Sequence, residues 1–244
     1  MSSKPLSGVK ALLYDVFGTV VDWQGSVHRQ LEQKCERNGV ASGSLDLLDF
    51  TRQWRRGYLR RTREISQGAP GPTNLLDDLL GQEAWRALSS WSDADRSEAV
   101  LFWHKLDGWP NSSKGMHCIK ALEPIVLQAT LSNGSARLLI DLARHADLPY
   151  DAIFSADLLK TYKPNAEMYQ GGCKLLQLRP EECAMVAAHI YDLQAASLYG
   201  LKTIYVRRET EDVDEDKSAI KSKTQGGHVD VVVDSLDEIA AYLQ

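Results

Sequence analysis

The chain has 244 residues, of which 43% are hydrophobic and 25% are charged, as expected for a globular enzyme with one core, or a core domain plus a smaller insertion. The formal net charge of −5 argues against a general nucleic-acid-binding protein. The 4 cysteines include no Cys-x-x-Cys pair, which disfavours zinc and favours reduced thiols. No apolar stretch has the length of a signal peptide or a membrane span. These features predict a soluble cytoplasmic protein with neither membrane nor nucleic acid as a partner.

The first expected element is a buried strand at residues 9–14, an apolar run that ends at Asp15. From Asp22 to about residue 106 the spacing of apolar residues is helical. The expected helices lie at residues 26–37, 46–65 and 92–106, the last opened by the N-cap Ser92, with a loop at residues 67–73. Trp85, Trp91 and Trp103 are expected to form their small core.

After Pro110, short apolar strands alternate with helices. Strands are expected at residues 125–131, 152–154, 183–188, 203–206 and 229–233, and helices at residues 136–145, 166–176 and 193–199. Gly200 fits a helix C-cap, and residues 209–227 read as a polar surface loop. This alternation predicts an α/β fold with a parallel sheet covered on both faces, formed by residues 1–21 and 110–244. Residues 22–109 would then be a helical cap inserted after the first strand.

Polar side chains follow four of the expected strands. These are Asp15, the pair Ser132 and Asn133, Lys163 after a short gap, and His189 with Asp192. Because the carboxyl ends of parallel strands meet at one edge, where open α/β sheets bind ligands, we expect these groups to lie together. The sequence therefore predicts an active site with a carboxylate, hydroxyls, an amine and a second acid.

The residue two places after Asp15 indicates the kind of leaving group. An Asp-x-Asp signature would place there a second acid that hands a proton to a departing alkoxide, but this chain has Phe17. A carboxylate nucleophile without that acid suits a leaving group that needs no proton, such as a halide.

These motifs resemble the haloacid dehalogenase superfamily and, within it, the type II L-2-haloacid dehalogenases. The motifs are Asp15-Val-Phe-Gly-Thr-Val-Val-Asp-Trp23, Trp54-Arg55, Leu131-Ser-Asn-Gly-Ser135, Tyr162-Lys-Pro-Asn-Ala-Glu-Met-Tyr169 and Met185-Val-Ala-Ala-His-Ile-Tyr-Asp192. The resemblance implies a Rossmann-like three-layer core with a helical cap. It also implies hydrolysis of small 2-haloalkanoic acids to 2-hydroxy acids with inversion at C2, no metal, and a homodimer.

The resemblance also implies roles for the catalytic residues. Asp15 would attack the halogen-bearing carbon and form an aspartyl ester. Lys163 would hold the pKa of Asp15 down, and Thr19 and Ser132 would hydrogen-bond its carboxylate. Asp192 would orient Lys163 and the hydrolytic water.

The cap would supply an anion-binding arginine. Six arginines within residues 52–63 are typical of a solvated helix face, but Arg55 follows Trp54 as the family's cap arginine does. Its guanidinium would bind the departing halide or the substrate carboxylate. Further contacts with substrate or halide are expected from Asn133, Phe17, Trp54 and Tyr169, and Trp23, Tyr58 and Tyr191 are candidate pocket walls.

The last motif departs from the family pattern Ser-Ser-Asn-x-x-Asp, whose Ser and Asn help to place the water. Here the first Ser is Ala187 and the Asn is His189, while Asp192 is kept. We hypothesise that His189 positions or deprotonates the water, since histidine accepts a proton near neutral pH.

Three alternatives stay open at this point. A magnesium-dependent phosphatase could use Asp15 and Asp192 as ligands, but Phe17 and Tyr191 replace two acids, so the sequence disfavours magnesium without ruling it out. A homologue without turnover would bind small carboxylates, with Ala187 and His189 marking the loss. A pure interaction protein would use the arginine-rich cap.

Overall fold

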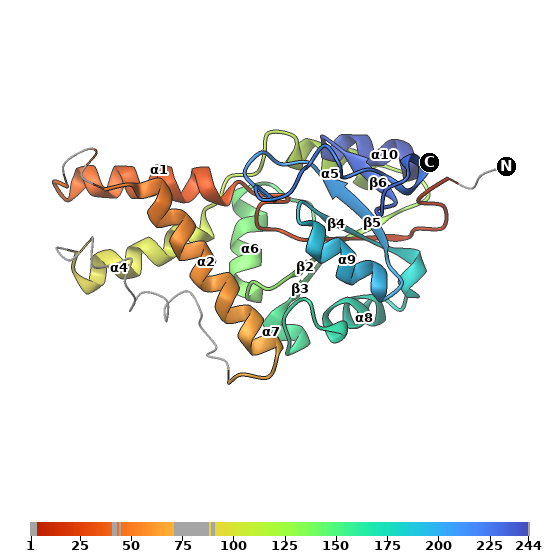
Figure 1. The fold of residues 1–244 in the computed structure, drawn as a ribbon, viewed down its shortest axis with the longest axis horizontal. Helices are drawn as coiled ribbons and strands as arrows, with labels where there is room; N and C mark the ends of the chain where they lie inside the picture. The colour runs from red at the N-terminus through yellow and green to blue at the C-terminus, as the bar shows by residue number, and fades with distance from the viewer. Residues whose placement is uncertain (1–3, 41–42, 44, 71–87, 89–90, 244) are drawn as a thin grey trace.

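The structure, a computed structural model, describes residues 4–40, 43, 45–70, 88 and 91–243. Its centre is a six-stranded sheet in which all neighbouring strands are parallel, in the order β3-β2-β1-β4-β5-β6 (Figure 1). The strands are β1 (Ala11–Tyr14), β2 (Leu127–Ser132), β3 (Ala152–Ser155), β4 (Cys183–Ala187), β5 (Lys202–Val206) and β6 (Val231–Val233). The predicted α/β fold with a parallel sheet is confirmed.

Helices cover both faces of this sheet. The strand β1, between β2 and β4, has apolar side chains on both faces, and these must be covered. Leu12 and Tyr14 belong to one hydrophobic cluster, and Ala11 and Leu13 belong to the other. The first cluster includes side chains of α5 (Ser112–Lys120) and α6 (Ala136–His145), and the second includes side chains of α8 (Ala166–Leu175) and α9 (Ile190–Leu198). The predicted three-layer arrangement is therefore present.

The remaining short helices lie around these layers. They are α7 (Ala156–Leu159), α10 (Ala240–Leu243) and the 3₁₀ helices Pro180–Glu182, Lys223–Gln225 and Leu236–Ile239. The sequence did not predict α5, whose stretch of nine residues has only Met116 and Ile119 as large buried apolar side chains.

Most of the described part of the segment between β1 and α5 is helical, and it includes the 3₁₀ helix Leu101–His104. Its helices are α1 (Trp23–Arg37), α2 (Leu47–Ser66) and α4 (Asp93–Val100), which extend to one side of the sheet in Figure 1. Asp22 caps α1 by accepting a hydrogen bond from the Gly25 amide, and Ser92 opens α4 in a capping box, as expected. The boundaries of the cap at residues 22 and 109 stay a prediction.

Aromatic side chains form the core that joins these helices. The Trp103 ring stacks on Trp23 with a centroid separation of 6.1 Å and meets Trp54 edge-on at 5.4 Å. Trp91 is also buried, as expected. Trp85 and the end of the expected loop, residues 71–73, lie outside the described residues.

Gly200 follows α9 with a φ of +90°, and the Leu201 amide donates to the Ala196 carbonyl at 3.1 Å, so Gly200 ends the helix as expected. The prediction that residues 209–227 form a surface loop is wrong at one point, because Glu211 is buried. The segment folds back toward the carboxyl end of β1, where Trp23 and His189 contact the Glu211 carboxylate.

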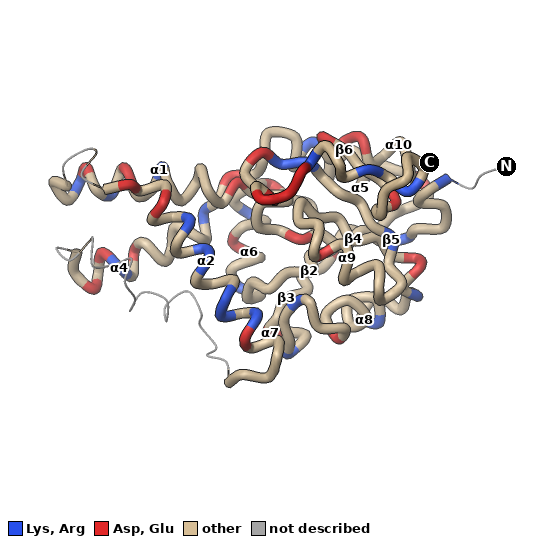
Figure 2. The backbone as a smooth tube through the Cα atoms, in the orientation of Figure 1, with Lys and Arg blue, Asp and Glu red and all other residues tan. Residues whose placement is uncertain are grey.

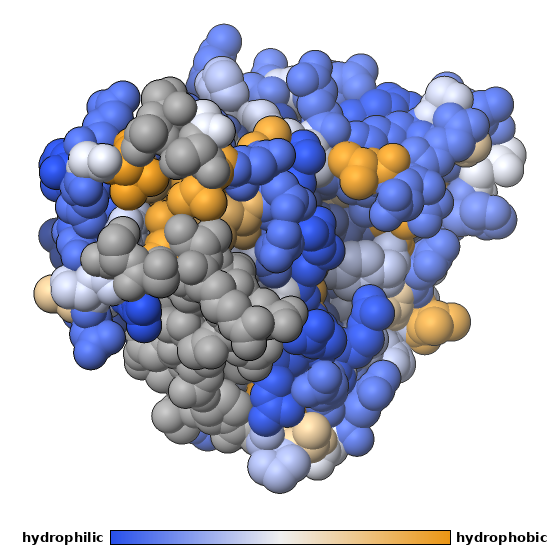
Figure 3. Space-filling model, turned by 60° about the vertical axis from the view of Figure 1, so that its left-hand side comes forward, coloured by the Kyte–Doolittle hydropathy of each residue, from blue (hydrophilic) through white to orange (hydrophobic). Residues whose placement is uncertain are grey.

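The described helices include none with the length and apolar character needed to cross a membrane. On the face shown in Figure 3, hydrophilic residues cover most of the described surface and hydrophobic residues form small groups.

Candidate active site

Asp15 lies directly after β1, at the carboxyl edge of the sheet. Its amide donates to the carbonyl of Val186 at 2.9 Å, which continues the pairing of β1 with β4 by one residue. The hydroxyl of Thr19 donates to Asp15 Oδ2 at 2.9 Å and accepts a hydrogen bond from the Ala188 amide at 2.9 Å. Thr19 therefore fixes the Asp15 carboxylate relative to the end of β4.

Lys163 joins the two acids that the sequence placed at this edge. Its Nζ lies 3.1 Å from Asp15 Oδ1 and 2.6 Å from Asp192 Oδ2. The Tyr169 hydroxyl donates to the other oxygen of Asp192 at 2.6 Å. All four side chains are buried, and Asp15 is the most exposed of them at 9%. One ammonium group thus holds both carboxylates, and Asp15 is the more exposed of the two acids.

The charges around Asp15 keep it ionised. Burial alone would raise the pKa of Asp15, but the positive charges of Lys163 and His189 outweigh it, and the net effect lowers this pKa. Burial raises the pKa of Asp192, and the two acids raise the pKa of Lys163. Asp15 is therefore a carboxylate at neutral pH, which is the form a nucleophile needs.

His189, the N-cap residue of α9, lies beside Asp15. Its Nε2 is 3.1 Å from the carbonyl oxygen of Phe17 and 3.7 Å from Asp15 Oδ2. Burial would lower the pKa of His189, but the carboxylates of Asp212, Asp15 and Glu211 raise it to about 9. The free site therefore holds an imidazolium at neutral pH.

Two acids that sequence reasoning missed complete the surroundings of His189. Glu211 Oε2 lies 3.6 Å from Nε2, and Asp212 Oδ1 lies 3.6 Å from Nδ1. Asp212 also accepts a hydrogen bond from the Ile190 amide at 2.8 Å. A pair of adjacent acids in a charged loop gives no local signal of burial, so only the fold reveals them.

Arg55, on α2, supplies a buried positive charge. Its guanidinium carbon lies 5.0 Å from the ring centroid of Phe17, 5.7 Å from that of Trp23 and 5.4 Å from that of Tyr58. The side chain is 8% exposed, and within the described residues it forms no ion pair and no hydrogen bond. A buried cation without an acid partner is suited to bind an anion.

Other arginines of α2 differ from Arg55. Figure 2 shows several positively charged residues along this helix. Arg52, Arg56 and Arg60 are exposed, as expected for a solvated face. Arg55 therefore differs from these three arginines in being buried.

Asn133 and Ser132 follow β2, but their contacts differ from those expected. Asn133 Oδ1 accepts a hydrogen bond from the Lys163 amide at 2.7 Å, and its carbonyl accepts one from the Tyr58 hydroxyl at 2.9 Å. Ser132 Oγ accepts from the Gly134 amide at 3.2 Å, and among the described residues it forms no hydrogen bond with Asp15. Asn133 thus positions Lys163 and connects the sheet edge to α2, while the expected bond from Ser132 to Asp15 is not formed.

Three aromatic residues were expected to contact substrate. Phe17 lies against Arg55 and stays a candidate. Trp54 packs in the aromatic core, and Tyr169 is fully buried with its hydroxyl on Asp192. In the structure these two residues support other side chains, and their contact with substrate stays a prediction.

A metal ion would need several protein ligands at one place. Among the described residues no group of three or more His, Cys, Asp or Glu side chains has that arrangement. Asp15 and Asp192, the two acids available for it, are both bound to Lys163. The residues present therefore do not fit a metal site formed by protein ligands alone.

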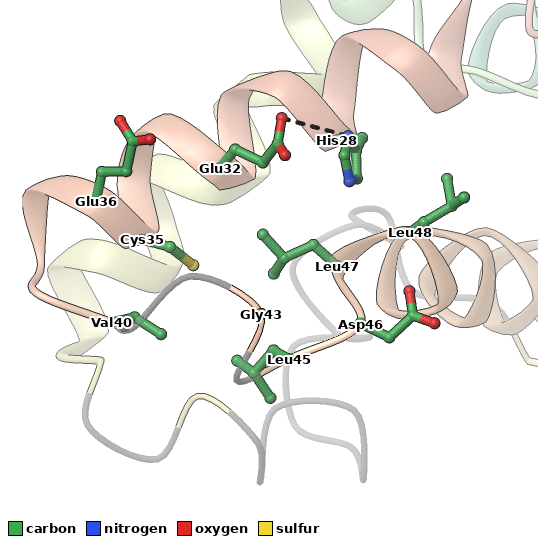
Figure 4. Close-up of a pocket in the computed structure, with 10 residues that line it drawn as sticks. All are labelled: His28, Glu32, Cys35, Glu36, Val40, Gly43, Leu45, Asp46, Leu47 and Leu48. Carbon is green, nitrogen blue, oxygen red and sulfur yellow. Dashed lines mark ion pairs between the residues drawn. The ribbon is translucent and has the colours of Figure 1, made fainter.

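A separate hollow of about 340 Å³ lies between α1 and the start of α2 (Figure 4). Its lining includes the ion pair of His28 with Glu32 together with Cys35, Leu45 and Leu47. None of the residues that line it belongs to the cluster around Asp15, so it is distinct from the candidate active site.

Comparison with known proteins agrees with this geometry. The model of the haloacid dehalogenase-like hydrolases matches residues 9–200. The chain is 27% identical to (S)-2-haloacid dehalogenase 4A of Burkholderia cepacia over 84% of this chain and 85% of the relative.

Two solved structures are similar over nearly the whole length. An L-2-haloacid dehalogenase has a TM-score of 0.79 with 34% identity, over 96% of this chain and 97% of the other. A defluorinating L-2-haloacid dehalogenase has a TM-score of 0.86 with 29% identity, over 99% and 98%. The family match, the similarity in sequence and the shared fold identify this chain as a member of the haloacid dehalogenase-like hydrolases.

Proposed function

We propose that this enzyme is an (S)-2-haloacid dehalogenase, which converts small 2-haloalkanoic acids to 2-hydroxy acids and releases halide. The observation that carries the proposal is an ionised Asp15, held by Lys163 and Thr19, next to Phe17 in place of an acid. A halide departs as a stable anion and needs no proton. The relatives described above are named 2-haloacid dehalogenases, which supports the same activity.

In the first half-reaction, a carboxylate oxygen of Asp15 attacks C2 of the substrate opposite the halogen. The new C–O bond forms as the carbon–halogen bond breaks, and the electron pair of that bond leaves with the halide. This in-line displacement inverts C2. Arg55, held among three rings and without an acid partner in the described part of the chain, would bind the substrate carboxylate or the halide.

In the second half-reaction, water attacks Cγ of the Asp15 ester. The neutral imidazole of His189 accepts one proton of that water. The tetrahedral intermediate expels the alkoxide, which takes the second water proton from the Asp15 carboxyl group. The 2-hydroxy acid leaves, Asp15 is again a carboxylate, and one oxygen of the water remains in Asp15.

We also propose that the reaction needs no metal. The proposal is supported by Lys163, whose ammonium group already lies between the two acids that a divalent cation would bind. Location in the cytoplasm and assembly as a homodimer stay predictions from the sequence, and gel filtration with light scattering tests the dimer.

Halide release tests the function directly. The purified enzyme is incubated with L- and D-2-chloropropionate in the presence of EDTA, and free chloride is measured. We expect release from the L enantiomer, unchanged by the chelator. Hydrolysis of phosphate esters in the presence of magnesium, without chloride release, would instead identify a phosphatase.

The covalent intermediate is tested with oxygen-18 water in a single turnover. We expect the label in the Asp15 peptide, because the water oxygen enters the ester carbonyl carbon and not C2. Label found only in the product would contradict the aspartyl ester.

A further inference from the structure

We propose that Glu211 is a positioning residue for the hydrolytic step, which holds the imidazole of His189 against the Asp15 ester. This inference rests on the proposed function, and it adds a residue from a part of the chain that no motif includes. The two residues come together because the chain after β5 folds back over the turn that follows β1. Glu211 Oε2 lies 3.6 Å from His189 Nε2, the same nitrogen that lies 3.7 Å from Asp15.

The Glu211 carboxylate is fixed by contacts of its own. Its Oε1 accepts hydrogen bonds from Trp23 Nε1 at 2.8 Å and from the Thr210 hydroxyl at 2.9 Å. The side chain is 7% exposed. A carboxylate with one oxygen bound by two donors keeps the other oxygen aimed at His189.

The turn after β1 leaves space for this carboxylate. Gly18 has a φ of +83°, and a Cβ built on it would lie 2.3 Å from the Glu211 carboxyl carbon. A side chain at position 18 would therefore displace Glu211 as well as strain the backbone. Glycine at position 18 therefore makes room for the buried carboxylate of Glu211.

Trp23 connects Glu211 to the anion-binding arginine. The indole N–H of Trp23 donates to Glu211, and its ring lies 5.7 Å from the Arg55 guanidinium carbon. Trp23 is the first residue of α1, so the cap contributes directly to the position of Glu211. Trp23 thus contacts both Arg55, which would bind the anion, and Glu211, which would position His189 for ester hydrolysis.

Ester formation changes the charge next to His189. The charged and titratable groups that act on this imidazole are Asp15, Glu211, Asp212, Arg55 and Tyr191. When Asp15 becomes an ester it loses its negative charge, while Glu211 and Asp212 keep theirs. The pKa of His189 then falls, the imidazolium releases the one proton that dehalogenation produces, and the neutral ring can accept a proton from water.

Glu211→Gln tests this role, because it keeps the shape of the side chain and removes the charge. We expect the burst of one halide per enzyme to stay within about 3-fold of the wild type, since Asp15 and Lys163 are unchanged. Breakdown of the ester should slow by about 10-fold or more. Rapid-quench halide measurement and mass spectrometry of the Asp15 peptide separate the two steps.

A second measurement does not depend on turnover. In NMR titrations of the free enzyme labelled at histidine nitrogens, Glu211→Gln should lower the pKa of His189 by about one unit. The acid limb of ester breakdown should move to lower pH by the same amount. Should Glu211→Gln not fold, Trp23→Phe keeps a ring near Arg55, removes one donor to Glu211 and should change ester breakdown in the same direction.

Glu209→Gln is the matched control, because Glu209 lies on the same loop and is exposed. It should behave as the wild type in every measurement. The inference is overturned if Glu211→Gln matches this control, if it slows both half-reactions equally, or if the His189 pKa does not move. Failure of the wild type to release halide would contradict the proposed function instead, and the NMR titration would still decide the role of Glu211.

Discussion

At the scale of single residues, three neighbours hold Asp15 in place, one from the turn that follows it and two from distant parts of the chain. Thr19 binds one carboxylate oxygen, Lys163 binds the other, and the His189 imidazole lies 3.7 Å away.

Asp15→Asn keeps the shape of the side chain but removes the charge that would attack carbon. Halide release should fall by about 10⁴-fold or more, with an unchanged circular dichroism spectrum. Residual activity near that of the wild type would show that another group is the nucleophile.

His189 is expected to act only after the halide has left. His189→Ala removes the group that accepts the proton of water, while Asp15 still has Lys163 as a counter-charge. This variant should release about one equivalent of halide and then stall as a covalent ester, visible as a mass increase on the Asp15 peptide. Steady turnover at the wild-type rate would exclude His189 from the hydrolytic step.

Arg55 is expected to act through the planar geometry of its guanidinium. Arg55→Lys keeps the charge but loses the flat surface that faces Phe17, Trp23 and Tyr58. We expect kcat/KM for 2-chloropropionate to fall by about 10- to 100-fold, the size of a lost charge-assisted contact. Arg60→Lys, on the exposed face of the same helix, is the control and should leave kcat/KM unchanged. Equal effects of the two substitutions would show that Arg55 does not bind the substrate or the halide.

The sequence could predict the site residues that belong to motifs. It could not predict a site residue that reaches the site only because a loop folds back over it. Asp15, Lys163 and Asp192 each follow a recognisable strand or a family motif, so their approach could be predicted. Glu211 lies in a polar segment whose composition is that of a loop, and only the packing against Gly18 and Trp23 buries it.

At the scale of elements, strands and long helices were predictable, because their apolar spacing is set by the faces they bury. The helix α5 was missed since its nine residues contain few large apolar side chains and two serines at the start. Its place is decided by contacts with the Leu236–Ile239 helix, near the other end of the chain. Such a helix is stabilised by tertiary packing more than by its own sequence.

A hydrogen bond from the Tyr58 hydroxyl to the Asn133 carbonyl joins the helix α2 to the sheet edge. Tyr58→Phe removes this bond and keeps the ring that faces Arg55. We expect a loss of about 1 kcal/mol in the free energy of unfolding and a raised KM. Urea denaturation and steady-state kinetics measure the two effects. Tyr199→Phe, whose hydroxyl forms no hydrogen bond among the described residues, is the control and should change neither.

At the scale of the whole molecule, the pKa of His189 makes stability depend on pH. This pKa is raised from 6.5 to about 9 in the folded state. The imidazolium therefore stabilises the fold fully below pH 6.5, and this contribution is lost as the pH rises through 9. Its size is about 3 kcal/mol at 1.36 kcal/mol per unit. Urea denaturation between pH 6 and 10 should show this decrease in the wild type and a smaller one in His189→Asn; equal slopes would contradict the assignment.

The order of helices and strands along the chain was predictable, because the helical stretch and the strand–helix alternation have different spacings of apolar residues. A helical stretch between one strand and a strand–helix alternation indicates an insertion, and the sheet order confirms that the first strand belongs with the later ones. Contacts between α2 and the turn after β2 depend on how these parts meet, which periodicity does not encode.

The central place of β1 also has a consequence for biosynthesis. Ala11 pairs with Leu127 on one side and with Cys183 on the other, so the first strand of this sheet can pair on both sides only after β4, the fourth strand along the chain, has been synthesised. Until then four apolar residues remain exposed to the crowded cell interior, where a chaperone can shield them. Nascent chains that stop before Cys183 should consequently aggregate or be degraded, whereas those that include β4 can pair β1 on both sides.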